Sequence, residues 1–92
     1  MRIKGTLHEI EWQWLKCKVV KGMFSDELTV IIQALDGETI SAFVPRDRVE
    51  CSEPSVGRVK VRVFDSTGQK FAVLPNETQT ILSVHESALA AA

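Results

Sequence analysis

The sequence predicts an all-β domain, a small five- to six-stranded antiparallel barrel with OB-like or SH3-like strand order and a short C-terminal tail. Apolar and polar residues alternate with a period of two over most of the chain. Turn-forming residues separate these segments at the spacing of small β domains. The 92 residues are 45% hydrophobic and 25% charged, as in an average globular domain. We expect one domain over residues 1–86 and a frayed tail, either helical or disordered, over residues 87–92.

The first strand carries both tryptophans of the chain and a change in its apolar pattern. Apolar residues fall on even positions from Ile10 to Trp14 and on odd positions from Leu15 to Val19. A β-bulge near Trp14-Leu15 changes the phase without a new element. We therefore interpret the tryptophans as core residues of a long, wrapped strand, with a position at the barrel rim as the alternative. A helix over residues 7–20 is the weaker interpretation because the run contains alternating aromatic residues.

Residues 28–44 predict a hairpin. The first half is rich in β-branched residues and ends at Asp36-Gly37, the strongest short signal for a two-residue type I′ turn. Such a loop pairs Gln33 with Ile40. Neither face of the hairpin is cleanly polar in this register, so we expect it to be central in the sheet or covered in part on both sides.

A second hairpin follows at residues 58–74. The run Arg-Val-Lys-Val-Arg-Val at residues 58–63 places three valines on one face and three cations on the other. Residues 65–69 favour a turn, and the returning strand ends before Pro75. Cys51, upstream, falls in a polar loop.

A last strand is predicted at about residues 79–84, where β-branched residues are frequent. It would pair with the N-terminal strand and close the sheet into a barrel, which removes exposed strand edges. A helix capped by Asn76, with Gln79 three residues later, is the alternative.

Several functional classes find no support in the sequence. No apolar run approaches the ~20 residues that span a bilayer, and no apolar stretch follows the basic N-terminus as in a secretory signal. We expect a cytoplasmic protein without a membrane segment. Cys17 and Cys51 do not form a paired metal motif and are expected as reduced thiols, with a disulfide as the alternative. No metal, cofactor or catalytic constellation is predicted, and an enzyme would have to use His8 or His85.

The net charge of −1 is unevenly distributed. Residues 1–22 are basic, residues 23–56 are acidic, and the remainder is weakly basic. If the first and third segments pair in space, they form a basic face while the middle segment supplies an acidic edge.

Two surfaces are candidates for function. A basic stripe that could track a phosphate backbone consists of Arg46, Arg48, Arg58, Lys60 and Arg62, with Lys16 and Lys18 as further members. A candidate protein-interaction surface consists of Trp12, Trp14, Met23 and Phe24. The stripe alone is also typical of a solvated strand face, and no aromatic residue interleaves with its cations along the sequence. We therefore predict a non-enzymatic protein-interaction or self-associating module, with single-stranded nucleic-acid binding as the alternative.

Residues 43–74 carry a resemblance to known families. The run Phe43-Val44-Pro45-Arg46, the later Val56-Gly57 and the alternating valines after it resemble the second half of RNA-binding OB-fold domains of the ribosomal type. This resemblance implies a five-stranded barrel that binds single-stranded RNA through aromatic and basic residues. The same stretch resembles the start of the dimerising hairpin in swapped-hairpin DNA-binding antitoxins.

Overall fold

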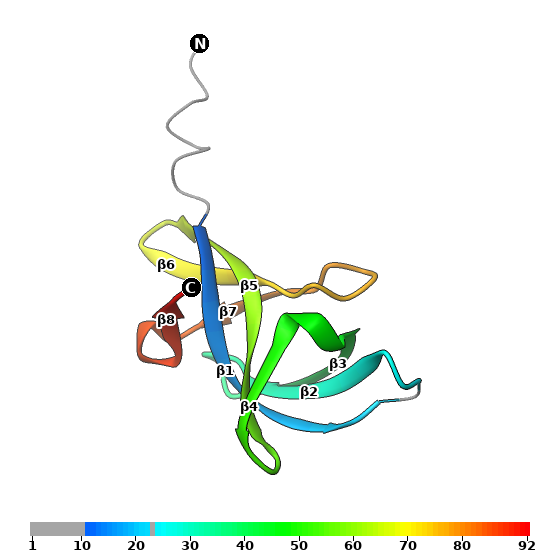
Figure 1. The fold of residues 1–92 in the computed structure, drawn as a ribbon. Helices are drawn as coiled ribbons and strands as arrows, with labels where there is room; N and C mark the ends of the chain where they lie inside the picture. Colours follow the sequence, from blue (N-terminus) through cyan, green and yellow to red (C-terminus); the bar gives the residue numbers. More distant parts are fainter. Residues whose placement is uncertain (1–10, 23) are drawn as a thin grey trace.

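Eight strands and two three-residue 3₁₀ turns make up the computed structural model, which describes residues 11–22 and 24–92. The elements are β1 (Glu11–Lys21), β2 (Glu27–Gln33), β3 (Thr39–Pro45), η1 (Arg46–Arg48), β4 (Val49–Glu53), β5 (Val56–Ser66), β6 (Gln69–Val73), β7 (Ile81–Val84), η2 (Glu86–Ala88) and β8 (Leu89–Ala91). They form one curled antiparallel sheet with the shape of a half-barrel (Figure 1). The all-β prediction is confirmed, and eight strands replace the five to six expected.

The sheet is organised around two long strands, β1 and β5. Its order is β3-β2-β1-β5-β6-β7, with β4 paired to β5 and β8 paired to β1. Within the described residues, the end strands β3 and β7 do not pair with each other, so the sheet stays open on that side. The predicted last strand exists as β7, but it pairs with β6 and not with β1. The closure expected there was wrong: β6 pairs along one edge of β7, and on the other edge the Ser83 carbonyl accepts from the Leu35 N–H of the β2–β3 loop.

β1 contains no bulge at Trp14-Leu15. Its pairing with β5 runs without interruption from Glu11 opposite Val63 to Lys18 opposite Val56. Odd positions from Leu15 onward face the core and even positions face outward, so both tryptophans lie on the outer face. The core interpretation was wrong because a strand in unbroken register cannot change faces.

The β2–β3 hairpin has a three-residue loop, not the predicted two-residue one. Ala34 donates its backbone N–H to the Glu38 carbonyl at 2.8 Å, and Gly37 donates to Ala34 at 2.9 Å. Gly37 has φ +91°, the left-handed conformation of a G1 bulge. The register is therefore shifted by one, with Gln33 opposite Thr39. Even positions of both strands now face the core, which gives the hairpin the clean sidedness that the predicted register lacked. The hairpin also lies at the end of the sheet, with β3 as the edge strand, so the expected central position was wrong.

The C-terminal residues belong to the sheet, contrary to the predicted tail at residues 87–92. After the η2 turn, β8 returns to β1 and pairs Leu89 with Leu15 and Ala91 with Gln13. Leu89 also packs against the core, which explains why the alanine-rich end is held. A second loop prediction was wrong as well, since Cys51 lies in β4 opposite Gly57.

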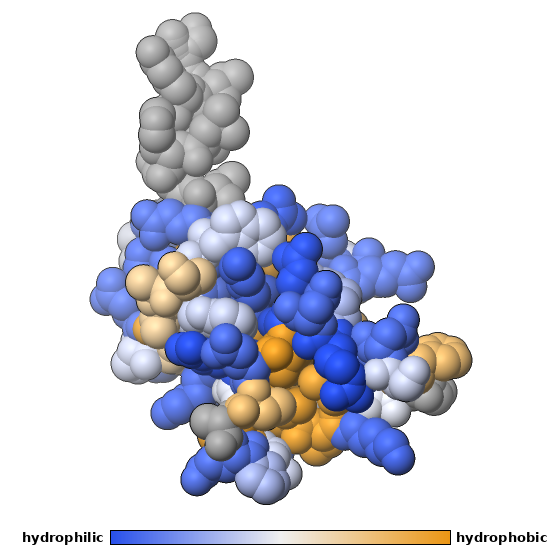
Figure 2. Space-filling model, viewed as in Figure 1, coloured by the Kyte–Doolittle hydropathy of each residue, from blue (hydrophilic) through white to orange (hydrophobic). Residues whose placement is uncertain are grey.

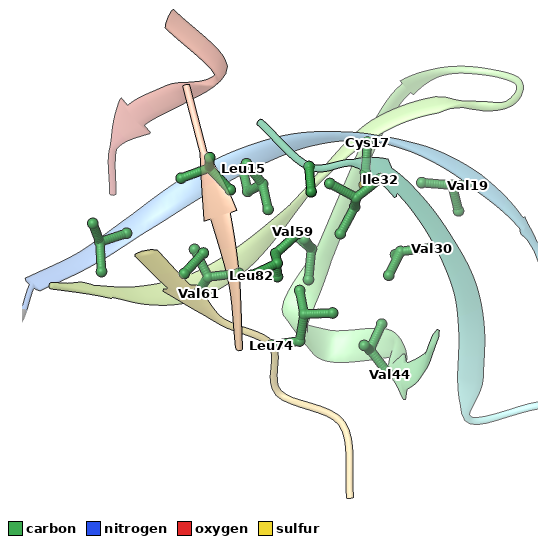
Figure 3. Packing of buried hydrophobic residues seen from close by; sticks show 14 residues of the cluster. Leu15, Cys17, Val19, Val30, Ile32, Val44, Val59, Val61, Leu74 and Leu82 are labelled. Carbon is green, nitrogen blue, oxygen red and sulfur yellow. The ribbon is translucent and has the colours of Figure 1, made fainter. Parts of the chain in front are cut away.

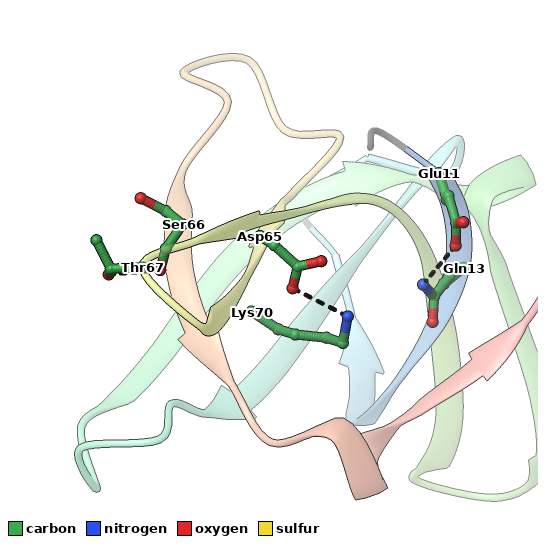
Figure 4. Close-up of polar contacts among 6 residues, drawn as sticks. All are labelled: Glu11, Gln13, Asp65, Ser66, Thr67 and Lys70. Atoms are coloured by element: carbon green, nitrogen blue, oxygen red, sulfur yellow. Dashed lines mark hydrogen bonds and ion pairs between the residues drawn. The ribbon is translucent and has the colours of Figure 1, made fainter. Parts of the chain in front are cut away.

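The core fills the concave side of the sheet (Figure 3). Its largest fully buried side chains are Leu15, Leu74, Val30, Val44, Val59 and Val61. The predicted sidedness of residues 58–63 is confirmed, because the three valines are buried and the cations are not. The predicted β5–β6 hairpin is also confirmed, and Lys70 Nζ donates to Asp65 Oδ1 across it at 3.0 Å (Figure 4).

Gly57 is required where three strands meet. A Cβ atom there would lie 2.5 Å from the Glu50 carbonyl oxygen and 2.9 Å from Val19 Cγ2. Because the first neighbour is backbone, β4 would have to move. We expect Gly57→Ala to lower the free energy of unfolding by about 1–3 kcal/mol, the usual cost of overpacking. Urea denaturation measures this, with Lys21→Ala as the control, since Lys21 is exposed on β1 and its substitution should change the free energy of unfolding by no more than about 0.5 kcal/mol. An unchanged midpoint for Gly57→Ala would contradict this close approach.

Candidate nucleic-acid interface

The outer face of β1 and β5 brings both tryptophans among cations. The antiparallel register places Trp12 opposite Arg62 and Trp14 opposite Lys60. We call this surface the tryptophan face and define it by Trp12, Trp14, Lys16, Lys18, Arg48, Arg58, Lys60 and Arg62. In Figure 2 blue and pale side chains cover the upper part of this region, and an orange apolar area lies below them. The first and third charge segments of the sequence thus do pair in space.

Trp14 carries the closest cation contact. The guanidinium carbon of Arg58 lies 4.7 Å from the ring centroid. Arg58 also donates to one carboxylate oxygen of Glu50, from Nε at 3.1 Å and from Nη2 at 2.7 Å. Such an exposed ion pair adds only about 0–1 kcal/mol to stability. Its consequence is positional, since it holds the guanidinium over the indole.

Trp12 lies between two further cations. The Arg48 guanidinium carbon is 5.5 Å from its ring centroid and Lys60 Nζ is 5.8 Å from it. Cation–π contacts at this range contribute about 0.5–1 kcal/mol each at exposed sites. Trp12 nevertheless remains 48% exposed. The indole is therefore oriented by its neighbours and still open to a ligand.

Each tryptophan lines its own groove. The Trp14 groove, of about 580 Å³, lies between β4 and the η2–β8 segment and includes Lys16 and Arg58. The Trp12 groove, of about 340 Å³, includes Arg48 and Arg62. Arg62 Nη2 also donates to Gln79 Oε1 at 3.4 Å in this second groove. Each of the two grooves is lined by an indole ring and by cations. Such a lining suits a ligand in which aromatic rings alternate with negative charges.

The structure does not unite all predicted site residues. Arg46 turns away from the tryptophan face and donates from Nε to the Ser25 carbonyl at 2.9 Å. Phe24 lies before β2 and lines a different groove. Met23 falls outside the described residues. The predicted interaction surface therefore does not form one patch, because Phe24 and the tryptophans line separate grooves.

Two cations of the face, Lys16 and Lys18, are less evident from the sequence pattern than from the structure. Lys16 and Lys18 continue the even positions of Trp12 and Trp14 along β1, and both are exposed. In the sequence these four residues occupy successive even positions, with the two tryptophans followed by the two lysines. A strand with a period of two places them all on one side. The interleaving of aromatic residues with cations arises across strands, so it is invisible along the chain.

Other chemistry-bearing groups lie apart from one another. Within residues 11–22 and 24–92, no cluster of three His, Cys, Asp or Glu side chains could hold a metal ion. His85 is exposed. Both cysteines are free thiols, with Cys17 buried and Cys51 exposed. No helix in the described part of the chain is long and apolar enough to cross a membrane.

Burial gives Cys17 a pH-dependent role in stability. Desolvation, with a smaller contribution from Cys51, raises the pKa of the Cys17 thiol from 9.0 to about 12. The unfolded chain therefore loses this proton first. The stabilising contribution is complete below pH ~9 and is lost as the pH rises toward 12. We expect the free energy of unfolding to fall by up to about 1.4 kcal/mol per pH unit in this window.

Urea denaturation at several pH values checks this expectation, with Cys17→Ala as the matched variant. All other side chains are the same in both proteins, so the difference between the two pH slopes isolates the thiol. Equal slopes would contradict the assignment. Iodoacetamide should modify Cys51 in the folded protein, while Cys17 should react only on unfolding.

Comparisons of the chain with protein-family models, curated proteins and solved structures give no match. The resemblances of residues 43–74 to RNA-binding OB-fold domains and to antitoxins therefore stay predictions.

Proposed function

We propose that this protein binds single-stranded nucleic acid through the tryptophan face. The observation that carries the proposal is the placement of Arg48, Arg58 and Lys60 over the rings of two tryptophans on one exposed sheet face. Stacking on aromatic side chains together with a basic groove is how proteins bind single strands without strong sequence preference.

The spacing of the tryptophans favours successive bases. Trp12 and Trp14 are two residues apart on one strand, which separates them by about 6.6–6.8 Å along β1. Each ring has its own groove, and each groove contains an arginine that can contact phosphate. A duplex would offer only its outer surface, because its bases are already stacked on one another.

The charges support the same ligand. Lys16, Lys18 and Arg62 extend the basic surface on either side of the two rings. The carboxylate of Glu50 is the exception, and it is already paired with Arg58. A phosphate backbone would therefore contact a basic surface, although the net charge of the whole protein is −1.

A titration tests the proposal directly. Both tryptophans of the chain lie on the face, so a stacked base should quench the intrinsic fluorescence. Ten-nucleotide oligo-uridine and oligo-thymidine are the probes, with a self-complementary duplex for comparison. The logarithm of the affinity should fall with the logarithm of salt concentration by about 0.7 per phosphate contacted.

Arg62→Ala should weaken this binding and reduce that salt slope by about 0.7, because it removes one phosphate contact. Lys70→Ala is the matched control, since Lys70 is paired with Asp65 on the β5–β6 hairpin. Absence of oligonucleotide binding at low salt would refute the proposal. The protein-interaction role predicted from the sequence is the second candidate, and the exposed Phe24 favours it.

A further inference from the structure

We propose that the open side of the half-barrel binds an extended, basic peptide segment of a protein partner as an added strand on β3. The proposal uses none of the contacts of the tryptophan face. It rests on the second candidate function, protein interaction, and gives that function a site and a partner chemistry.

The backbone of β3 offers hydrogen-bonding groups to such a strand. In an antiparallel pair, hydrogen-bonded and non-hydrogen-bonded positions alternate. Ala34 donates to Glu38 and Arg46 donates to Asp26, which sets the even positions of β3 toward β2. The N–H groups of Ser41 and Phe43 therefore point to the open side. Within the described residues, these groups have no hydrogen-bond partner.

β3 lacks the features that usually protect an edge strand. Natural edges carry lysines, prolines or bulges that prevent pairing with another chain. Residues 39–44 contain no charged side chain and no proline, and Pro45 stands at the end of the strand. Phe43 is 51% exposed on this edge strand. An unprotected edge of this kind is a template for β-strand addition.

The space beside β3 can hold a segment of chain. A groove of about 860 Å³, the seam groove, separates β3 from the loop after β6. Its far wall is held in shape by Asn76, which accepts from the Thr80 N–H and donates to Thr80 Oγ1, both at 2.9 Å. At the other end, Leu35 donates to the Ser83 carbonyl at 2.9 Å and joins the hairpin loop to β7. The groove is therefore bounded on both sides by fixed backbone.

The lining selects the partner's charge. All the charged side chains that line the seam groove are carboxylates, namely Asp26, Glu27 and Glu77. Phe24 and Phe43 add apolar surface beside them. A strand with alternating apolar and Lys or Arg residues matches both features. A second copy would bring the same carboxylates against each other, so electrostatics disfavours self-pairing here.

Amide hydrogen exchange followed by NMR tests the proposal. The probe is the peptide Thr-Val-Lys-Val-Lys-Val-Thr with blocked ends, and the control peptide carries Glu in place of Lys. At saturation with the basic peptide, exchange at the Ser41 and Phe43 N–H groups should slow by about tenfold or more, because pairing shields them from water. The Ala42 N–H, already directed to β2, should change little.

Substitutions locate the site. Ser41→Pro removes a donor that faces away from β2, so it should spare the hairpin and weaken peptide binding by about tenfold. Ser41→Ala, which keeps the N–H, is the matched control and should bind normally. Glu77→Lys, which leaves the backbone unchanged, should weaken binding of the basic peptide and strengthen that of the acidic one. It keeps the test decisive if the proline variant misfolds.

Other outcomes overturn the proposal. Equal binding of the basic and acidic peptides would show that the partner need not be basic. Slowed amide exchange elsewhere, without a change at Ser41 and Phe43, would show that β3 is not the binding site. Protection of Ser41 and Phe43 that rises with protein concentration alone would assign the edge to a second copy. Oligonucleotide titrations of Ser41→Pro keep the two functions apart, since that variant should retain normal nucleic-acid affinity.

Discussion

The double variant Trp12→Ala/Trp14→Ala is expected to lose single-stranded oligonucleotide binding almost completely. Each base stacked on an aromatic side chain contributes about 1–3 kcal/mol, which is roughly a 5- to 150-fold change in affinity per ring. The single variants should show this loss separately. Fluorescence anisotropy of a labelled oligo-uridine measures it, because the double variant has no tryptophan and each single variant keeps only one.

The control for this experiment is Phe24→Ala. Phe24 is more exposed than Trp12, at 68% against 48%, yet it lies away from β1 and β5. It should therefore leave the affinity unchanged. If Phe24→Ala and Trp14→Ala weakened binding equally, non-specific hydrophobic contact would explain the interaction. The tryptophan face would then not be the binding site.

Leu15→Ala is expected to destabilise the fold by about 2–5 kcal/mol, the range for removing a fully buried leucine and leaving a cavity. Leu15 has no exposed surface and lies where β1 pairs with both β5 and β8. Lys16→Ala is the matched control, because it changes the neighbouring, outward position of the same strand. Its effect should stay within about 0.5 kcal/mol.

Urea denaturation, monitored by tryptophan fluorescence, measures the free energy of unfolding of both variants. The comparison also tests the sidedness of β1. If Trp14→Ala were strongly destabilising and Leu15→Ala were mild, the tryptophans would be core residues and the unbroken β1–β5 register would be incorrect.

Separation of charge explains how one small chain can offer two different surfaces. Basic residues of β1 and β5 gather on the outer face, whereas Asp26 and Glu27 from the acidic middle segment line the seam groove. The net charge of −1 is the sum of these opposed regions. Local patches, and not the total, decide which partner each region attracts.

The prediction of a small β domain from the sequence succeeded where a local rule was sufficient. The alternation at residues 58–63 determined which side chains are buried, because successive residues of a strand point to opposite faces. The turn at residues 65–69 led to the β5–β6 hairpin as expected. Failures occurred where a single residue changes the outcome. At Asp36-Gly37, a loop longer by one residue shifted the register of the whole hairpin.

By itself, then, the sequence determined an all-β fold, the sidedness of its clearest strand and a division of charge along the chain. Only the tertiary structure decided on which face of the sheet the tryptophans lie. Their apolar pattern fits a core as well as an outer face, and the choice was made by continuous pairing with β5, which sets Trp12 opposite Arg62 and Trp14 opposite Lys60. The open edge of β3 was equally undetermined, because strand pairing between distant segments depends on backbone geometry that no local pattern encodes.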